Sequence, residues 1–483
     1  MDTTTENKLE SPNTLFRSLD SLPPNYNSKV ISSSSIKTLL KGTAEDFLNF
    51  QYTDDPSLSM SLGNLFEELI LKGILVAYEL DIQDPLNAIP ELGEMEYIAK
   101  FINTFEKFLE ENSERYQVVD SIPIPSSEGV KTTVEYCLNH GITPLSDHER
   151  VLEAAHANNY LTNYKDAEKL ANALWDRYGG RDYYNYLFTA NNAEIILTEN
   201  IYPLFITSAK TILNLKSIID DYYPLDKYYT VFNPRVEKIN LPNNKLLYKA
   251  DLDVLFIKKF NLEHTNQEFP YLGGVVDIKL TTMSPIQAYH TFNMKYQGAF
   301  YYGILSDMLP SDEYSVKINY TDKTNVLLET NEGIELINPL EELAKSLSSF
   351  EKDLIYIQTA FQNDSKSSYQ LLLNSSSNST AINESFLKPC LPPIFLFGKL
   401  HQKATYSLIM NHQGVLSALL GSNISMENEV IKDLFSEGEF DFSNNYIKHT
   451  PGIINLLEFL YYSLTNSDTD LTYREYYHQN AGI

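Results

Sequence analysis

Residues 274–301 read GVVDIKLTTMSPIQAYHTFNMKYQGAFY and form the most informative stretch of this chain. The apolar pair Val275-Val276 leads into Asp277 and Lys279, and Ser284-Pro285 then marks the start of a helix. Residues two apart on a strand point to the same face, so a carboxylate and an ammonium should lie side by side at the end of a buried strand. A hard oxygen ligand beside a cation that orients or activates water suits metal-assisted phosphodiester cleavage.

The Asp-x-Lys tripeptide alone has an ordinary alternative, a solvated turn or a surface ion pair. Gly-Val-Val before Asp277 is too apolar for a surface loop, and this favours a strand. Two further strands are predicted upstream, at Val236–Leu241 and Leu246–Ile257, around the turn Pro242–Asn244.

Alternation within the second of these strands places Asp251 and Asp253 on one face. Because the next strand carries Asp277, adjacent strands can bring Asp253 and Asp277 together. With the backbone carbonyl of Ile278, these two carboxylates form a candidate Mg²⁺ or Mn²⁺ site. The alternative is that Asp251 and Asp253 form the solvated side of an amphipathic strand.

This combination of motifs resembles the PD-(D/E)XK nuclease superfamily: Asp253, the run Asp277-Ile278-Lys279, and a helix with Gln297 and Tyr301. Within it, the chain is similar to the RecE and RecB-like branch of phage and prophage exonucleases. There the Asp-x-Lys strand is followed by a helix with the spacing Q-x-x-x-Y, which Gln297 and Tyr301 reproduce. The resemblance covers a short part of the chain well and the rest loosely.

The resemblance implies a metal-dependent DNA exonuclease, acting 5′→3′ in phage-type recombination or replication. Asp253 and Asp277 would hold Mg²⁺ or Mn²⁺, and Lys279 would orient or activate the attacking water. Gln297 and Tyr301, one helical turn apart, would support the site and contact DNA. Two lysines are further DNA-binding candidates, Lys249 and Lys295.

A third metal ligand is expected on an N-terminal helix. The segment AEDFLNFQYTDDPSLSMSLGNLFEELILKG resembles the family's opening, where G-x-x-x-H supplies a histidine, and its spacing from Gly63 places Glu67 at that position. Glu68 is the alternative ligand. The other interpretation is an ordinary amphipathic helix with both glutamates in solvent.

Four positions depart from the family pattern without removing a metal ligand. Asp251 stands where a strand Arg is usual, and Leu280 separates Lys279 from the following threonines. Met294 replaces a helix Tyr, and Gly298 stands where Ala is common. The missing Arg bears on how this strand could contact DNA.

Two alternatives in function remain open on sequence grounds. One is an endonuclease or repair nuclease of the same superfamily, since the catalytic pattern does not separate it from an exonuclease. The other is a catalytically inactive descendant that binds DNA or acts as a scaffold. The resemblance makes linear duplex ends the expected substrate, and a single-strand annealing protein and a second copy of the chain are candidate partners.

Composition restricts the class further. The 483 residues are 43% hydrophobic and can bury a sizeable core. The only cysteines, Cys137 and Cys390, cannot supply a four-cysteine iron–sulfur cluster. A long apolar run and a secretory leader are both lacking, so a cytoplasmic protein without a membrane segment is expected, in the host cytoplasm if phage-encoded.

The net charge of −27 is unusual for a protein that binds nucleic acid. Residues 227–300, however, hold nine Lys or Arg against six Asp or Glu, a local balance of +3 that leaves −30 for the remainder. An acidic exterior around a locally basic channel is therefore expected.

The predicted fold is α/β (α+β), with a mixed central sheet flanked by helices in a restriction-endonuclease-like core. Strands are expected at 229–241, 246–258, 272–280, 313–319 and 324–330, and helices at 191–215, 285–308, 339–361 and 453–464. The predicted organisation is a flexible N-terminus at 1–35, a nuclease domain at 36–361 (helical over 36–225, catalytic sheet and helices over 226–361), a Ser/Asn-rich linker or loop at 362–385, and a C-terminal region of unassigned role at 386–483.

Overall fold

The computed structural model of the protein is a mixed α/β structure. No helix among the described residues is both long enough and apolar enough to cross a lipid bilayer. The described residues are 29–49, 58–79, 91–112, 115–119, 123, 125–144, 146–192, 195–198, 201–240, 246–259, 272–306, 308–309, 316–341, 390–425, 447–466 and 468–481.

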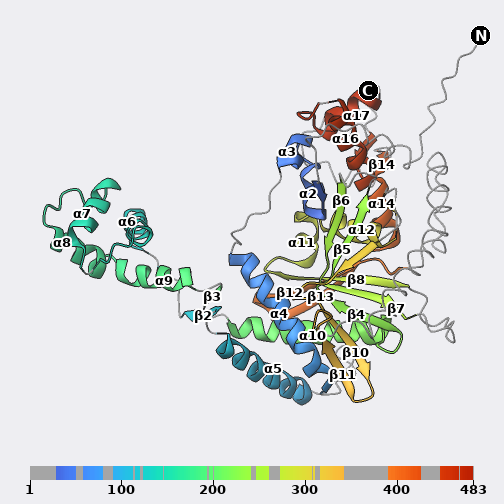
Figure 1. The fold of residues 1–483 in the computed structure, drawn as a ribbon, viewed down its shortest axis with the longest axis horizontal. Helices are drawn as coiled ribbons and strands as arrows, with labels where there is room; N and C mark the ends of the chain where they lie inside the picture. Colours follow the sequence, from blue (N-terminus) through green and yellow to red (C-terminus); the bar gives the residue numbers. More distant parts are fainter. Residues whose placement is uncertain are drawn as a thin grey trace, which may run out of the picture.

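A seven-stranded sheet forms the centre, with the strand order β11-β10-β4-β7-β8-β12-β13 (Figure 1). Each neighbouring pair is antiparallel except β8 and β12, which run parallel. The strand with the Asp-x-Lys pair, β8, therefore lies inside the sheet, between β7 and β12. The strands are β4 Tyr228–Phe232, β7 Val254–Lys258, β8 Gly273–Thr281, β10 Asn325–Thr330, β11 Gly333–Ile337, β12 Ile394–Lys399 and β13 Ala404–Ile409.

Helices cover both faces of this sheet. The residues that point to one face and those that point to the other are both mainly apolar, so each face needs a covering layer. On one face Val276 and Ile278 join a core with α4, α5 and α10. On the other face Val275 and Phe395 join a core with α2, α12, α14 and α16. The covering helices are α2 Ser33–Thr38, α3 Ala44–Asn49, α4 Leu58–Glu79, α5 Glu91–Glu111, α10 Ile201–Tyr222, α11 Pro285–Thr291, α12 Met294–Leu305, α14 His412–Leu420, α16 Ile453–Asn466 and α17 Tyr473–Ala481.

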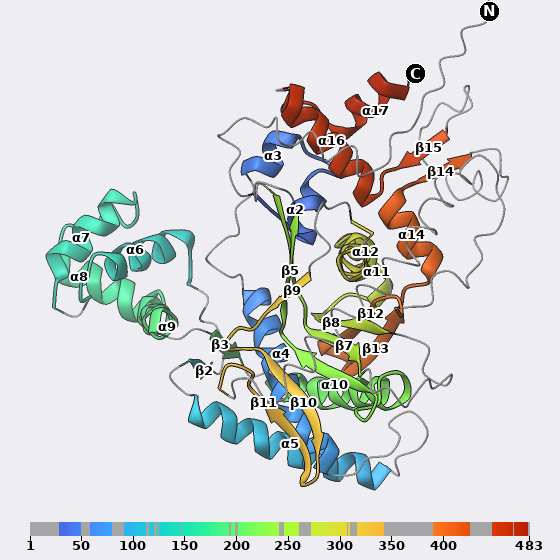
Figure 2. The same ribbon diagram turned by 45° about the vertical axis from the view of Figure 1, so that its right-hand side comes forward.

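A second sheet of four strands stands beside the first, in the order β1-β6-β5-β9 (Figure 2). Its strands are β1 Lys29–Ile31, β5 Arg235–Asn240, β6 Leu246–Asp251 and β9 Val316–Asn319. The chain passes between the two sheets from β4 to β5, from β6 to β7 and from β9 to β10. The first two of these passages lie side by side and are joined by backbone hydrogen bonds, from Asn233 to Asp253 and from Leu252 to Pro234.

A small helical unit lies apart from the two sheets in both ribbon views (Figures 1 and 2). It has its own apolar core, which includes Val134, Leu174 and Trp175. The short parallel pair β2 and β3 connects it to the rest. Its elements are α6 Glu128–Asn139, α7 His148–Ala157, α8 Ala167–Asn172, a π-helix at Ala173–Arg177 and α9 Gly180–Asn192, flanked by β2 Tyr116–Val119 and β3 Ile195–Thr198.

Several predicted elements differ from the observed ones because the chain bends where the apolar pattern continues. The strands expected at 229–241 and 246–258 are each two strands in different sheets, β4 with β5 and β6 with β7. The helix expected at 285–308 is divided into α11 and α12 at Asn293, whose φ of 49° ends the first helical segment. The helix expected at 191–215 is interrupted by β3, and β11 was not predicted.

The expected domain limits are also changed by pairings distant in sequence. β1 pairs with β6, so residues 29–31 are not part of a flexible N-terminus. β12 pairs with β8 over six residues, so the region after 386 completes the central sheet and is not a separate unit. The helix expected at 453–464 is observed as α16. Residues 1–28, 342–361 and 362–385 lie outside the described residues.

Gly274 on β8 tests how closely the central sheet and α10 are packed. A Cβ at this position would lie 1.9 Å from the hydroxyl oxygen of Tyr223, whose ring stacks on Phe256 at 4.1 Å between ring centroids and cannot easily withdraw. We expect Gly274→Ala to lower the free energy of unfolding by about 1–3 kcal/mol, measured by urea or thermal denaturation.

The matched control is Gly63→Ala in α4, where an added Cβ meets no atom within 4 Å. Helix propensity predicts that this substitution raises stability by about 0.5–1 kcal/mol. Equal unfolding transitions for Gly274→Ala and the wild type would show that Tyr223 can move away from β8 without loss of stability.

Candidate active site

Asp253 and Asp277 meet because β7 and β8 are antiparallel neighbours. Val254 pairs with Val276, and extending this register by one residue sets Asp253 opposite Asp277. Asp253 accepts a hydrogen bond from the backbone N–H of Ile278 at 2.5 Å. The proximity expected from the sequence is therefore observed, although the expected single strand carrying both Asp251 and Asp253 is not.

The position of Asp253 depends on the passages between the two sheets. Pro234 lacks an N–H and Asn233 has φ of 51°, so β4 cannot continue directly into β5. The N–H of Asn233 donates to the carbonyl of Asp253 at 2.9 Å, and the N–H of Leu252 donates to that of Pro234 at 3.0 Å. These bonds lock Leu252 and Asp253 into a bend, so Asp251 ends one sheet and Asp253 begins the approach to the other.

The ammonium of Lys279 lies among three oxygen atoms. Its Nζ is 2.9 Å from Oδ2 of Asp277, 3.5 Å from Oδ2 of Asp253 and 3.2 Å from the carbonyl oxygen of Ile278. Asp277 is fully buried, whereas the side chains of Lys279 and Asp253 are 28% and 16% exposed to solvent. The cluster is thus open to solvent on one side only.

The second carboxylate oxygen of Asp277 is held by the side-chain amide of Gln297, which is itself held by Tyr301 and Lys37. Gln297 of α12 donates from Nε2 to Oδ1 of Asp277 at 3.0 Å and to the hydroxyl of Tyr301 at 2.8 Å. Tyr301 in turn donates to the carbonyl of Asp251 at 3.3 Å. Lys37 of α2 donates from Nζ to Oε1 of Gln297 at 3.3 Å, which fixes the orientation of the amide.

The two adjacent glutamates of α4 have different surroundings. Glu68 accepts hydrogen bonds from Arg115, at 3.2 Å, and from the hydroxyl of Tyr116. Glu67 is half-buried and close enough to Asp253 for its pKa to respond to that carboxylate. Of the two alternatives, Glu67 is the one on the side of the cluster.

The electrostatics of the cluster follow from burial and from mutual charge. Burial, then the charge of Asp253, raises the pKa of Glu67 to about 8. Burial likewise raises the pKa of Asp277 to about 6, against the opposing charge of Lys279. For Lys279 burial alone would lower the pKa, but Asp253, Asp277 and Glu67 outweigh it and hold the pKa well above its usual range. The lysine is therefore a permanent cation here.

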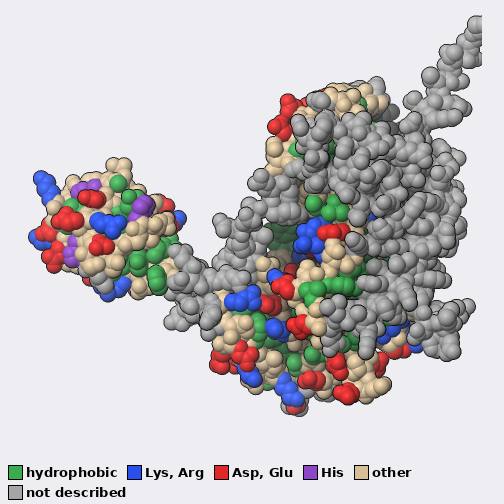
Figure 3. All heavy atoms as spheres, in the orientation of Figure 1, with side chains coloured by type: hydrophobic (Ala, Val, Ile, Leu, Met, Phe, Trp, Pro, Cys, Tyr) green, Lys and Arg blue, Asp and Glu red, His purple; other side chains and the backbone are tan. Residues whose placement is uncertain are grey.

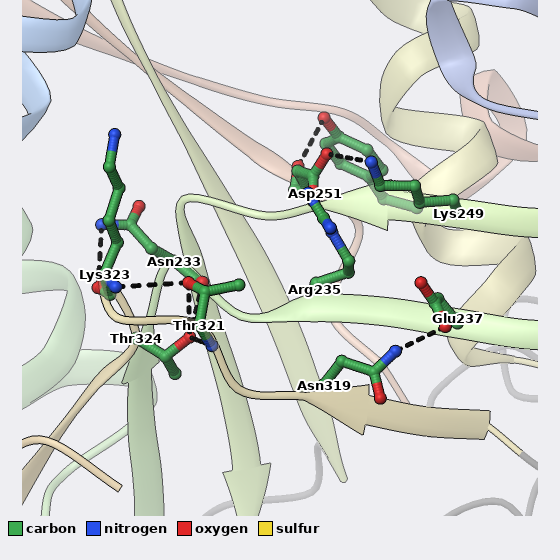
Figure 4. A network of polar contacts seen from close by, with 10 residues as sticks. Asn233, Arg235, Glu237, Lys249, Asp251, Asn319, Thr321, Lys323 and Thr324 are labelled. Carbon is green, nitrogen blue, oxygen red and sulfur yellow. Dashed lines mark hydrogen bonds and ion pairs between the residues drawn. The ribbon is translucent and has the colours of Figure 1, made fainter. Parts of the chain in front are cut away.

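The other predicted DNA-binding lysines are not part of this cluster. Lys249 pairs with Asp251, its Nζ 3.3 Å from Oδ2, on the four-stranded sheet (Figure 4). Lys295 places its ammonium over the ring of Tyr296, 4.9 Å from the ring centroid. Because Lys295 precedes Gln297 by two helical positions, it projects toward roughly the opposite side of α12.

The oxygen atoms of the cluster fit a hard divalent cation. Two carboxylates and one backbone carbonyl converge on a single ammonium, and these are the donor types that Mg²⁺ and Mn²⁺ prefer. Oδ2 of Asp277 is buried and forms no hydrogen bond of normal geometry in the described part of the chain. Among those same residues, no three His, Cys, Asp or Glu side chains are close enough together to hold a metal, so Glu67 does not complete a ligand set as placed.

Sequence reasoning missed two cations near the site. Lys37 lies in a six-residue helix far upstream, and its pKa is lowered to about 8, mainly by burial and against the charge of Asp277. Arg235 pairs across strands with Asp251, the residue that stands where the family has an Arg. Opposite charges on two strands of one predicted hairpin could have indicated Arg235. No local pattern in the sequence indicated Lys37.

The space-filling view places charged side chains of both signs close together in the middle of the face seen in Figure 1, between α2–α3 and α4–α5 (Figure 3). The surface recedes there, as expected for a site reached from one side.

Comparison with known proteins identified no relative of this chain. No protein-family model matches the chain, and neither a curated protein nor a solved structure was found to match it. The function is therefore inferred from the geometry of this site and from the resemblance of its motifs.

Lys279 separates two carboxylates that would otherwise repel each other. We expect Lys279→Met to lower the stability of the metal-free protein by about 1–3 kcal/mol, below the value for fully buried pairs because the lysine is partly exposed. Thermal unfolding in EDTA measures the change, with Lys169→Met on the helical unit, where the side chain is 77% exposed, as the control. An unchanged transition in Lys279→Met would mean that the ammonium does not hold the two carboxylates together.

Proposed function

We propose that the protein is a metal-dependent deoxyribonuclease of the PD-(D/E)XK type, with a restriction-endonuclease-like core built on β4, β7, β8 and β12. The observation that carries this proposal is the meeting of Asp253, Asp277, Lys279 and the carbonyl of Ile278 at one end of adjacent strands. Buried carboxylates beside a permanently charged amine are costly for folding and are typical of catalytic sites.

The groups that would hold Mg²⁺ or Mn²⁺ are Asp253, Asp277 and the carbonyl of Ile278. Glu67 is a further candidate ligand, provided that its side chain moves toward them. When bound, the ion supplies Lewis acidity toward a phosphate oxygen and lowers the pKa of water. The chain's own contribution is positional: Gln297 holds the carboxylate of Asp277 in one orientation, and Tyr301 holds Gln297.

Lys279 is suited to stabilise negative charge on the phosphate and to orient water. In the metal-free protein the neighbouring carboxylates hold the pKa of Lys279 above its usual range, so the side chain is an ammonium. A fixed ammonium beside the site of charge development stabilises a transition state without reorganisation.

The resemblance to RecE-type enzymes supports an exonuclease that starts at linear duplex ends, with 5′→3′ polarity. The nearest alternative is an endonuclease or repair nuclease with the same catalytic groups. An end-labelled linear duplex and a closed circular duplex separate the two, since only the endonuclease cleaves the circle.

The catalytic test uses Lys279→Ala and Asp277→Asn on the end-labelled duplex with Mg²⁺. We expect each variant to cleave about 10²–10³-fold more slowly than the wild type or worse, because each removes a preorganised charge at the reacting phosphate. Lys107→Ala on α5, where the side chain is 76% exposed, is the control and should cleave normally. Circular dichroism confirms folding, and near wild-type cleavage by Lys279→Ala would refute the assigned role.

A second candidate function is a catalytically inactive DNA-binding scaffold. The observation that favours it is that the described Asp and Glu side chains form no ready-made group of three metal ligands. The ammonium of Lys279 neutralises the two carboxylates without any ion.

Calorimetric titration with Mn²⁺ distinguishes the two candidates without measuring cleavage. If the site belongs to a nuclease, the wild type binds Mn²⁺ with measurable heat and Asp277→Asn loses this binding, because the substitution removes a charged oxygen ligand. The control is Asp176→Asn, at a carboxylate of the helical unit that is 59% exposed. Identical isotherms for the wild type and Asp277→Asn would favour the scaffold.

A further inference from the structure

The four-stranded sheet presents a set of polar side chains on one face. The cross-strand pairs Arg235–Asp251, Glu237–Lys249 and Arg235–Asn319 place these five residues, here called the polar face, on the same side. The alternate residues of the same strands, which include Val236, Tyr248 and Ala250, are buried in the core with α12. One side of this sheet is therefore core, and the other carries partly exposed polar and charged side chains, whose hydrogen bonds and ion pairs are drawn in Figure 4.

Ion pairing fixes the cations of the polar face in place. Nε of Arg235 lies 2.7 Å from Oδ1 of Asp251, and Nζ of Lys249 lies 3.3 Å from Oδ2 of the same carboxylate. The Arg235 side chain remains 38% exposed, and that of Asp251 62% exposed. Within the described residues the guanidinium is held through Nε alone, so its other N–H groups can meet an anion from solvent.

The polar face is continuous with the candidate active site. Asp251 is two residues from Asp253, and its carbonyl accepts the hydrogen bond from Tyr301. On the other side, Lys323 lies in the exposed turn between β9 and β10, joined to Asn233 by a hydrogen bond from the Asn233 amide to its carbonyl at 3.4 Å. Lys323 and Asn233 thus lie together where the chain passes between the two sheets, in the same network of polar contacts as Arg235 and Asp251 (Figure 4).

We propose that the polar face, extended by Lys323, binds the sugar–phosphate backbone of the DNA whose scissile phosphate lies at Asp253 and Asp277. This inference rests on the proposed nuclease function and names the surface that would hold its substrate. A guanidinium and an ammonium on the sheet, with the ammonium of Lys323 on the neighbouring turn, are groups that pair with phosphates of a DNA backbone. None of the five residues of the polar face is aromatic, so it offers no ring for base stacking, and its contacts are independent of sequence.

Asp251 has a defined part in this proposal: it orients Arg235 and also competes with phosphate for it. Removing either partner breaks the same ion pair, but the two removals should have opposite effects on DNA. Arg235→Ala removes a phosphate ligand, and Asp251→Asn removes a repelling charge while leaving the backbone carbonyl that Tyr301 uses. A purely structural ion pair would give changes of the same sign.

The experiment measures binding of a fluorescein-labelled blunt duplex to the full-length chain by anisotropy, with Ca²⁺ in place of Mg²⁺, over a range of salt concentrations. Arg235→Ala and Lys323→Ala are expected to weaken binding several-fold and to reduce the salt slope by about 1 each. Asp251→Asn is expected to strengthen binding at low salt. Cleavage assays should show KM rising more than kcat falls in Arg235→Ala.

The chain contains a matched control pair on the helical unit. Nη2 of Arg181 lies 2.7 Å from Oδ1 of Asp176, and the two side chains are 46% and 59% exposed. Arg181→Ala and Asp176→Asn make the same charge changes in a similar ion pair away from the polar face, and neither should alter DNA binding by more than the bulk change in charge.

The outcomes separate this proposal from the proposed function. If the wild type cleaves DNA but Arg235→Ala and Asp251→Asn bind like their controls, or shift binding in the same direction, the polar face is overturned and the nuclease stands. If the wild type binds DNA with the opposite-sign pattern but does not cleave, the nuclease is overturned and the polar face stands. If the wild type does not bind DNA, both are overturned.

Discussion

The contact between the ammonium of Lys279 and the carboxylates of Asp253 and Asp277 is the interaction on which the rest of the site depends. Two carboxylates at the edge of a buried core repel each other unless a cation lies between them. The ammonium supplies that charge from the same strand as Asp277, so the site can fold before any ion or substrate arrives. The hydrogen bonds of Gln297 then have a fixed oxygen to act on.

This contact exists because the strands change sheets. A continuous strand through Asp251 and Asp253 would have put both side chains on one face, with Asp251 as close to β8 as Asp253. The bend at Leu252 ends one ladder and starts another, and the bonds from Asn233 and to Pro234 hold it. The side chain of Asp251 therefore lies on the polar face of the four-stranded sheet, and only Asp253 lies next to Asp277. One irregular dipeptide thus divides two carboxylates between two different tasks.

The sequence predicts the parts of this arrangement that depend on local pattern. The β8 strand, the helix start at Ser284-Pro285 and the closeness of Asp253 to Asp277 follow from alternation, capping and adjacency. The bend at Leu252 could not be predicted, because apolar alternation continues through it and its hydrogen bonds come from another passage. The pairing of β12 with β8 joins residues that are more than a hundred positions apart, and Lys37 reaches Gln297 from a helix too short to show a periodic pattern.

The acidic character of the chain gives the polar face a particular physical setting. With a net charge of −27, the chain as a whole repels a polyanion, so the DNA binding proposed here would have to come from a few fixed cations. An unpaired arginine would sample many rotamers, whereas Arg235 is already oriented by Asp251. The pairing lowers the affinity of any single phosphate contact but also lowers the entropy lost on binding. The proposed exonuclease would advance along its substrate and would need contacts that are well oriented and individually weak, and an arginine held by an exposed carboxylate has both properties.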